Sequence, residues 1–233
     1  LRLDRTGECA VFGQEATSAA AARAARAHSA PQPGRTVYSP GGAAMTCSLG
    51  PVRCELKLCV SPEDGALIKR VRLSNDSSVA ETVRVADCAP VALGTQAEML
   101  SHPAFRQLFI ESERIAQCAV ALKSRPRSPE ERRLAIVHLV STPGSISCQT
   151  DFERLVGRTG STQRPGGIRW DMDGTVGAVL NPCSAMQTAV TVGAGQTATL
   201  HFAFGLVEED EIQRWIERNF SESAAERASQ LAA

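Results

Sequence analysis

The stretch Val52-Arg53-Cys54-Glu55-Leu56-Lys57-Leu58-Cys59-Val60 alternates between two kinds of side chain. Every even position is apolar, and three of the four odd positions carry a charge. Successive side chains of a β-strand point to opposite faces, so this period of two predicts a strand with one face in a core and one in water. The next residues, Ser61-Pro62-Glu63-Asp64-Gly65, are typical of a turn, because proline presets φ and glycine accepts a positive φ.

Similar runs recur along the chain. We expect further strands at 68–73, 79–85, 116–122, 134–141, 146–150, 184–192 and 197–206. The turn residues Asn75-Asp76-Ser77-Ser78 and Gly193-Ala194-Gly195 predict antiparallel hairpins between the strands that flank them. Many strands with few helices indicate a mostly β fold, a large antiparallel β-sandwich.

The last residues change to a helical period. Glu208-Glu209-Asp210-Glu211 suits the first turn of a helix, and the side chains that follow form one apolar stripe: Ile212, Trp215, Ile216 and Phe220. A second helical run, 224–231, follows Ser221 and Ser223, either of which suits a cap. We therefore expect three regions: a partly irregular segment at 1–42 with an Ala/Arg-rich stretch, a sandwich at 43–207, and a C-terminal helical linker at 208–233.

Charge and composition narrow the function classes. Lys and Arg number 25 and Asp and Glu number 25, so no basic excess points to nucleic acid. No run approaches 18 apolar residues, so no membrane segment is predicted. The start Leu1-Arg2-Leu3-Asp4 indicates a fragment of a longer chain. The eight cysteines are sparse, and Cys54 and Cys59 fall on opposite strand faces, so we expect reduced, mostly buried thiols and a cytoplasmic location.

The usual catalytic patterns are missing from the sequence. Four histidines, at positions 28, 102, 138 and 201, lack metal-ligand spacing, and we interpret His138 and His201 as hydrogen-bonded structural residues. Glu111 and Glu113 share one face of an extended segment, roughly 7 Å apart, which suits either an acid–base pair or, as we favour, a solvated strand face. Asp171-Met172-Asp173-Gly174 predicts a turn rather than a calcium loop. No catalytic residue, metal or cofactor is predicted.

One segment is a candidate substrate-binding or domain-interface site. It begins at Thr150, runs to Gly167, and contains three arginines and no lysine. Guanidinium forks suit bidentate bonds to carboxylates, phosphate or sugar hydroxyls. The alternative is an Asp151–Arg154 pair that only pins a loop. The candidate residues are Asp151, Arg154, Gly157, Arg158 and Trp170.

Several motifs are shared with a known family. The runs at 60–64, 69–75 and 102–113, the last reading His-Pro-Ala-Phe-Arg-Gln-Leu-Phe-Ile-Glu-Ser-Glu, together with 151–158, 175–182 and 223–228, resemble the β-supersandwich domain of the cyclic β-1,2-glucan synthases. These are grouped with cellobiose- and chitobiose-phosphorylase-like enzymes in glycoside hydrolase family 94. The likeness covers roughly residues 45–230. Departures are the Ala/Arg-rich N-terminal stretch and Ala86-Asp87-Cys88, where the family has Tyr-Ala-Glu.

The resemblance implies a domain that precedes a catalytic (α/α)6 barrel in the same polypeptide. That barrel carries the general acid and the phosphate site, so the resemblance implies a non-catalytic, carbohydrate-associated domain that supports the barrel and substrate binding. The parent is then a phosphorylase-type or synthase enzyme, the latter attached to the inner membrane. Two other hypotheses stay open: a self-sufficient carbohydrate-binding module for a β-glucan or oligosaccharide, and a purely structural domain that forms a homodimer.

Overall fold

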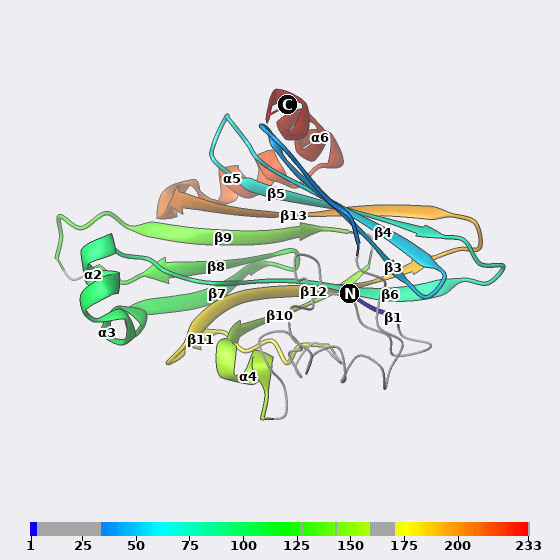
Figure 1. Cartoon of the computed structure of the whole chain (residues 1–233). Coiled ribbons are helices and arrows are strands. Elements are labelled where there is room, and N and C mark those ends of the chain that lie inside the picture. The colour runs from blue at the N-terminus through cyan, green and yellow to red at the C-terminus, as the bar shows by residue number, and fades with distance from the viewer. Residues whose placement is uncertain (4–33, 127, 143, 159–170, 233) are drawn as a thin grey trace.

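The computed structural model describes residues 1–3, 34–126, 128–142, 144–158 and 171–232, and two antiparallel sheets face each other within it (Figure 1). The larger sheet has nine strands in the order β11-β7-β8-β9-β13-β5-β4-β3-β2, and the smaller has four in the order β1-β6-β12-β10. The larger sheet comprises β2 Thr36–Ser39, β3 Gly42–Leu49, β4 Val52–Val60, β5 Leu67–Asn75, β7 Ile110–Ala116, β8 Ala119–Ser124, β9 Leu134–Ser141, β11 Gly177–Ala178 and β13 Thr197–Glu208. The smaller comprises β1 Arg2–Leu3, β6 Glu81–Pro90, β10 Ser145–Asp151 and β12 Pro182–Val192. The predicted large antiparallel sandwich is confirmed.

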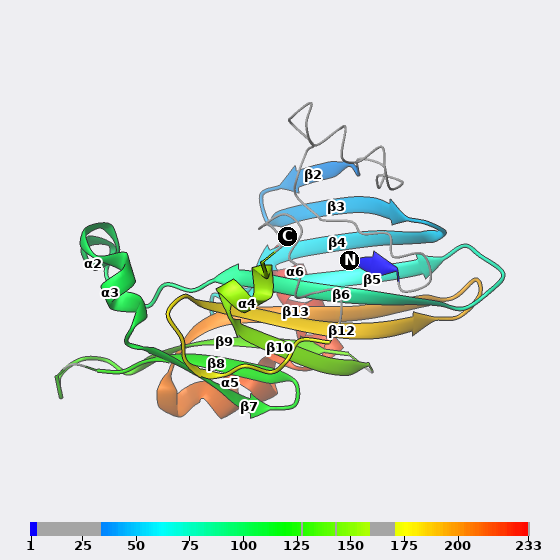
Figure 2. The same ribbon diagram turned by 90° about the horizontal axis from the view of Figure 1, so that it is seen from below.

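Short helices lie outside the two sheets. The helices α5 Ile212–Asn219 and α6 Glu222–Ala232 cover the outer face of the larger sheet, after the 3-10 turn η2 Glu209–Glu211 (Figure 1). The helix α4 Phe152–Val156 lies against β10 and β12 of the smaller sheet, seen from below in Figure 2. The helices α2 Gln96–Ser101 and α3 Pro103–Gln107 sit together at one end of the sandwich (Figure 2).

The main core fills the space between the sheets. Its members come from inward-facing positions of both sheets, among them Leu73, Val83, Leu122, Met186 and Phe202. A second cluster joins the outer face of the larger sheet to α5 and α6, and a third joins α4 to β12. The larger sheet is therefore apolar on both faces, which explains why β9 reads as a nearly continuous hydrophobic run.

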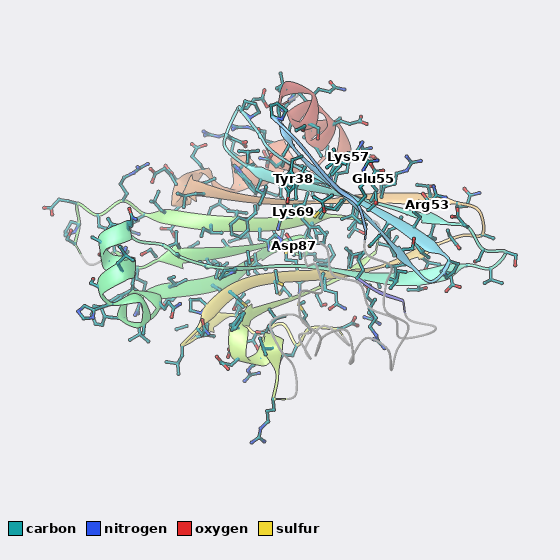
Figure 3. The ribbon with its side chains drawn as sticks, in the orientation of Figure 1. Tyr38, Arg53, Glu55, Lys57, Lys69 and Asp87 are labelled. Atoms are coloured by element: carbon teal, nitrogen blue, oxygen red, sulfur yellow. The ribbon has the colours of Figure 1, made fainter. Side chains whose placement is uncertain are left out.

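The strand β4 spans the predicted residues, and its faces divide as the alternation indicates. Cys54 belongs to the main core and Cys59 to the cluster beneath α6, so the two thiols do lie on opposite faces. Arg53 and Lys57 have side chains that are 67% and 60% exposed (Figure 3). The pattern fails at its end, where Cys59 is buried and Val60 is exposed, because α6 covers this part of the outer face: Cys59 Sγ lies 3.6 Å from Ser229 Oγ.

Both predicted hairpins are wrong. The strands β5 and β6 are consecutive, but β5 pairs with β4 and β13, whereas β6 pairs with β12 and β1. Likewise β12 pairs with β6 and β10, and β13 pairs with β5 and β9. Each short connection therefore carries the chain from one sheet to the other. A turn sequence marks where a strand ends, but it does not decide which sheet the next strand joins.

Asn75 bonds to both crossings, the β5–β6 and β12–β13 connections that carry the chain from one sheet to the other. Its buried amide donates hydrogen bonds to the carbonyl oxygens of Val79 at 2.7 Å, Val192 at 3.0 Å and Gly193 at 3.1 Å. Its backbone N–H donates to Gln196 O at 2.9 Å. Asn75 Oδ1 in turn accepts from the Ser77 backbone N–H and hydroxyl. One side chain thus holds the β5–β6 connection against the β12–β13 connection.

The C-terminal helices fold back onto the larger sheet. Ile212, Trp215 and Ile216 of the predicted stripe are buried, whereas Phe220 is exposed. The Trp215 ring lies over Gly205 of β13, where a Cβ would come within 2.6 Å of Trp215 Cζ2. Ser221 caps α6, because its Oγ accepts from the Ala224 N–H at 3.1 Å. In the part of the chain described, no helix is long and apolar enough to cross a membrane.

Candidate functional site

A charged pair lies between the sheets. Lys69 projects from β5 and Asp87 from β6, and Lys69 Nζ donates to Asp87 Oδ1 at 2.7 Å and to Oδ2 at 2.8 Å. Figure 3 places both labelled residues in the space between the two layers. Their side chains are 18% and 15% exposed. The pair therefore joins the larger sheet to the smaller one by a charge-assisted bond.

Two more polar side chains extend this pair. His138 of β9 places Nε2 3.3 Å from Asp87 Oδ2, and its Nδ1 lies 2.9 Å from the hydroxyl oxygen of Ser184 on β12. The His138 ring is enclosed by Phe202 and Phe204, with ring centroids at 5.9 and 5.6 Å. We call Lys69, Asp87, His138 and Ser184 the interlayer network. Each sheet contributes two of its members.

The ionisation of Asp87 follows from its neighbours. Burial alone raises the pKa of a carboxyl group, because it disfavours the charged form. Here His138 and Lys69 outweigh burial and lower the pKa of Asp87 from 3.8 to about 2. Asp87 is thus a carboxylate at neutral pH, and its charge is balanced inside the sandwich.

The interlayer network contains the residue types of a nucleophilic triad, but it is closed to substrate. His138 and Ser184 are both 0% exposed. A general base must come within hydrogen-bond reach of the proton that it removes from a substrate. The geometry instead suits a polar cross-link between two apolar layers. The interpretation of His138 as a hydrogen-bonded structural histidine is confirmed, and so is that of His201, whose Nε2 lies 2.9 Å from Asn219 O.

The arginine segment is built around α4. Asp151 caps this helix, because its Oδ1 accepts from the Glu153 N–H at 3.0 Å. Gly157 ends the helix with a φ of +70°, which favours glycine, and its N–H donates to Glu153 O at 2.8 Å. The buried Leu155 anchors α4 on the smaller sheet. The segment is therefore locally well specified.

The two arginines of this segment differ in their surroundings. Arg154 Nη1 lies 3.1 Å from Asp173 Oδ2, closer than the 3.7 Å between Arg154 Nε and Asp151 Oδ2. Burial raises the pKa of Asp173, but bonds from Thr175 and Arg154 outweigh it and lower that pKa. The structure thus brings together Asp151, Arg154 and Gly157, while Arg158 is exposed beside them. Trp170, the fifth candidate, lies outside the described residues.

The carboxylates Glu111 and Glu113 lie on β7, and each pairs with a basic side chain on β8 or directly after it. Glu111 Oε1 is 3.2 Å from Arg125 Nη1, and Glu113 contacts Lys123. Both side chains are close to half exposed, at 46% and 49%. This is the solvated strand face that the sequence analysis favours. Asp173 and Gly174 also form a turn, in which Gly174 has a φ of +74°.

The interlayer network is not predicted as a unit by the sequence patterns. Its signal is nevertheless visible: Lys69 occupies an inward position beside Val71 on β5, and Asp87 follows Val83 and Val85 on β6. Opposite charges at inward positions of two consecutive strands predict a buried pair only if the strands lie in different sheets. Because β5 and β6 were predicted to pair in one hairpin, a buried pair between them was not expected.

Comparisons with known proteins found a matching family model and a curated relative. A family model described as "Glycosyl hydrolase 94, supersandwich domain" matches residues 7–223. The cyclic beta-(1,2)-glucan synthase NdvB of Rhizobium meliloti (strain 1021) is 26% identical over an alignment of 182 residues that covers 73% of this chain and 6% of the synthase.

Solved structures with a similar arrangement include a putative kojibiose phosphorylase from human microbiome. It has a TM-score of 0.47 and 8% identity, with 83% of this chain and 23% of the other covered. Another is the polysaccharide lyase BACCELL_00875, with a TM-score of 0.42, 14% identity, and coverage of 74% and 23%. The chain therefore spans a small part of the length of the proteins that it resembles.

Proposed function

Since the chain belongs to the glycosyl hydrolase 94 supersandwich domain family, we propose that it is a non-catalytic domain that supports the catalytic (α/α)6 barrel of a phosphorylase-type or cyclic β-1,2-glucan synthase enzyme. The observation that carries this proposal is the closure of the interlayer network. Among the described residues it joins a serine, a histidine and an aspartate, and its histidine and serine have no exposed surface. The chemistry is then assigned to another part of the polypeptide.

The other carboxylates support the same assignment. Glu111 and Glu113 lie on an open strand face, and each is paired with a basic side chain. A glycosidase acid needs a raised pKa, which burial or a second carboxylate provides. We therefore assign to this domain the roles of supporting the barrel and contributing to substrate binding.

The first experiment measures activity. The purified 233-residue chain is incubated with β-1,2-glucan and inorganic phosphate, and release of sugar phosphate is measured. We expect no release above the rate of a heat-denatured control. Sugar phosphate formed in proportion to the concentration of chain would show that the chain itself carries catalytic residues, and the proposal would fail.

The second experiment measures association with the barrel. We propose residues 208–233 as the segment that leads toward the barrel, and the Asp151–Arg158 segment as a contact with barrel or substrate. The barrel is produced as a separate polypeptide, and its binding to the chain is followed by calorimetry. We expect Arg158→Ala to weaken binding, while Arg53→Ala on the exposed face of β4 serves as the matched control. Equal affinity of both variants would remove Arg158 from the interface, and no binding at all would contradict the supporting role.

We also propose that the domain works in the cytoplasm. The seven cysteines of the described residues, Cys47, Cys54, Cys59, Cys88, Cys118, Cys148 and Cys183, are all free. Burial raises the pKa of the Cys183 thiol to about 12, so this thiol stays protonated and unreactive at neutral pH. Titration of reactive thiols in the folded and in the unfolded chain tests this. Disulfides in the purified protein would lower the number of thiols found in the unfolded chain below eight.

A further inference from the structure

A cavity opens at the end of the sandwich that carries α2 and α3. It has a volume of about 750 Å³ and lies between the segment that follows β6 and the ends of β8, β9 and β13. This volume falls within the range of small-molecule sites, which is about 300–1,000 Å³. No residue of the interlayer network or of the arginine segment lines it. It is therefore a separate feature of the domain.

Arg106 of α3 forms a charged wall of this cavity. Its side chain is 8% exposed, and it donates from Nε to Leu93 O at 2.8 Å and from Nη2 to Glu131 Oε1 at 3.0 Å. Its third nitrogen, Nη1, lies 3.8 Å from Glu98 Oε1, too far for a hydrogen bond. Among the described residues, Nη1 is a buried donor without a hydrogen-bond acceptor.

A second polar group on the same wall has no partner. Ser124, at the end of β8, is 9% exposed, and its hydroxyl makes no hydrogen bond with any described residue. About nine in ten buried polar groups of folded proteins are hydrogen-bonded. Arg106 Nη1 and Ser124 Oγ are two of several buried polar atoms of the described residues without a partner, and both belong to residues that line this cavity. A ligand that accepts from Arg106 and exchanges a hydrogen bond with Ser124 would satisfy both.

The charges of the lining define the class of ligand. Glu98 and Glu131 face Arg106, and Arg132 donates from Nε to Glu208 at 2.9 Å. The positive and negative side chains balance, so an anion would meet two carboxylates and a cation would meet two guanidinium groups. Carboxylate oxygens accept hydrogen bonds, whereas a guanidinium donates them and a hydroxyl does both. Leu134 and Leu206 add an apolar side to the cavity.

From these features we propose that the cavity binds a neutral saccharide. Its hydroxyl groups accept from Arg106 Nη1, donate to the glutamates and bond Ser124, while its C–H face rests on the leucines. Gly94 keeps the loop close to this wall, since a Cβ there would lie 2.9 Å from Arg106 Nε. The site is independent of barrel docking, so either proposal can fail while the other holds.

The test uses the full chain and two probes. Binding of a β-1,2-linked glucotetraose and of glucose 1-phosphate is measured by calorimetry at up to about 10 mM. Amide chemical shifts map the site. We expect the tetrasaccharide to bind, to bind more tightly than the phosphate ester, and to shift the amides of Gly94, Thr95 and Ser124. Tighter binding of the anionic probe would overturn the neutral class of ligand.

A conservative variant separates the site from folding. Ser124→Ala removes one hydroxyl, and we expect saccharide affinity to fall about fivefold or more, the effect of one lost hydrogen bond. The exposed Ser48→Ala on β3 is the matched control and leaves affinity unchanged, with both variants keeping the wild-type thermal midpoint. The proposal is overturned if the tetrasaccharide does not bind, which would leave a cavity filled by water, or if its shifts fall on the loop of Arg158.

Discussion

Lys69 and Asp87 illustrate how a buried charge is tolerated. Each ion loses hydration between the sheets, and the pair is stable only because both carboxylate oxygens accept from one ammonium group. We expect Asp87→Asn to destabilise the chain by about 3–5 kcal/mol, because it leaves Lys69 as an unpaired buried charge. Urea unfolding measures this. The double variant Lys69→Met/Asp87→Leu should recover most of the loss, and a double variant as unstable as the single one would contradict this account.

The same pair makes stability depend on acid. The pKa of Asp87 is about 2 in the folded chain, below its ordinary value of 3.8. As the pH falls, Asp87 is protonated in the unfolded chain before it is protonated in the folded chain. The stabilisation is therefore present above pH 3.8 and is lost as the pH falls through 2. It amounts to about 2 kcal/mol. The free energy of unfolding of the wild type should fall more steeply between pH 5 and pH 2 than that of the double variant. The same pH dependence in the wild type and the double variant would contradict a lowered pKa of Asp87.

At the scale of elements, α5 depends on one glycine. The Trp215 ring occupies the place of a side chain at position 205, where a Cβ would lie 2.6 Å from Cζ2. We expect Gly205→Ala to cost about 1–3 kcal/mol and to shift the tryptophan emission to the red as α5 moves away. A Trp170→Phe background leaves Trp215 as the sole tryptophan. Gly193→Ala, which meets only the Gln196 side chain, is the control and should leave the emission unchanged.

The docking of the C-terminal helices also depends on pH. His201 lies beneath them, where burial lowers its pKa below 6.5 despite the Asn219 carbonyl and Glu222, while Arg70 adds to the lowering. Its neutral form is favoured in the folded chain, so the stabilisation is present above pH 6.5 and declines as the pH falls toward the folded pKa. Between pH 7 and pH 5 we expect the free energy of unfolding to fall more in the wild type than in His201→Gln. The exposed His102→Gln should behave like the wild type, and the same behaviour in His201→Gln would refute this.

The elements themselves follow closely from the sequence. β4 and β9 have the predicted bounds, and the α5 stripe of Ile212, Trp215 and Ile216 is buried. These features depend on neighbours in the chain, which period and turn chemistry describe well. The alternation of side chains along a strand does not predict which element packs against each of its faces. Cys59 occupies a position expected to face water, yet α6, which is distant in sequence, covers it. In the candidate site, the helix cap at Asp151 and the helix end at Gly157 depend on neighbouring residues in the chain. The ion pair of Arg154 does not, because its partner Asp173 lies 19 residues away.

At the scale of the molecule, the two sheets are joined where the chain crosses between them. Both crossings were predicted as hairpins, because glycine and asparagine end a strand equally well whether the chain turns back or changes sheets. The choice is made by long-range pairing, in which β13 inserts between β5 and β9 and β12 lies between β6 and β10. The two crossings then meet at one end of the sandwich. A single residue, Asn75, bonds to both.

Asn75 should therefore control the stability of the whole sandwich. Asn75→Ala removes three donated hydrogen bonds and leaves buried carbonyl oxygens without a donor, which we expect to cost about 2–4 kcal/mol. Asn75→Asp is nearly isosteric but places a carboxylate against those same oxygens, so it should cost at least as much at pH 7. Because the residue holds both sheets together, unfolding should remain a single transition that moves to lower urea concentration. The exposed Ser78→Ala, in the same β5–β6 connection, is the control. If Asn75→Asp were as stable as the wild type, the amide would not be what ties the two crossings together.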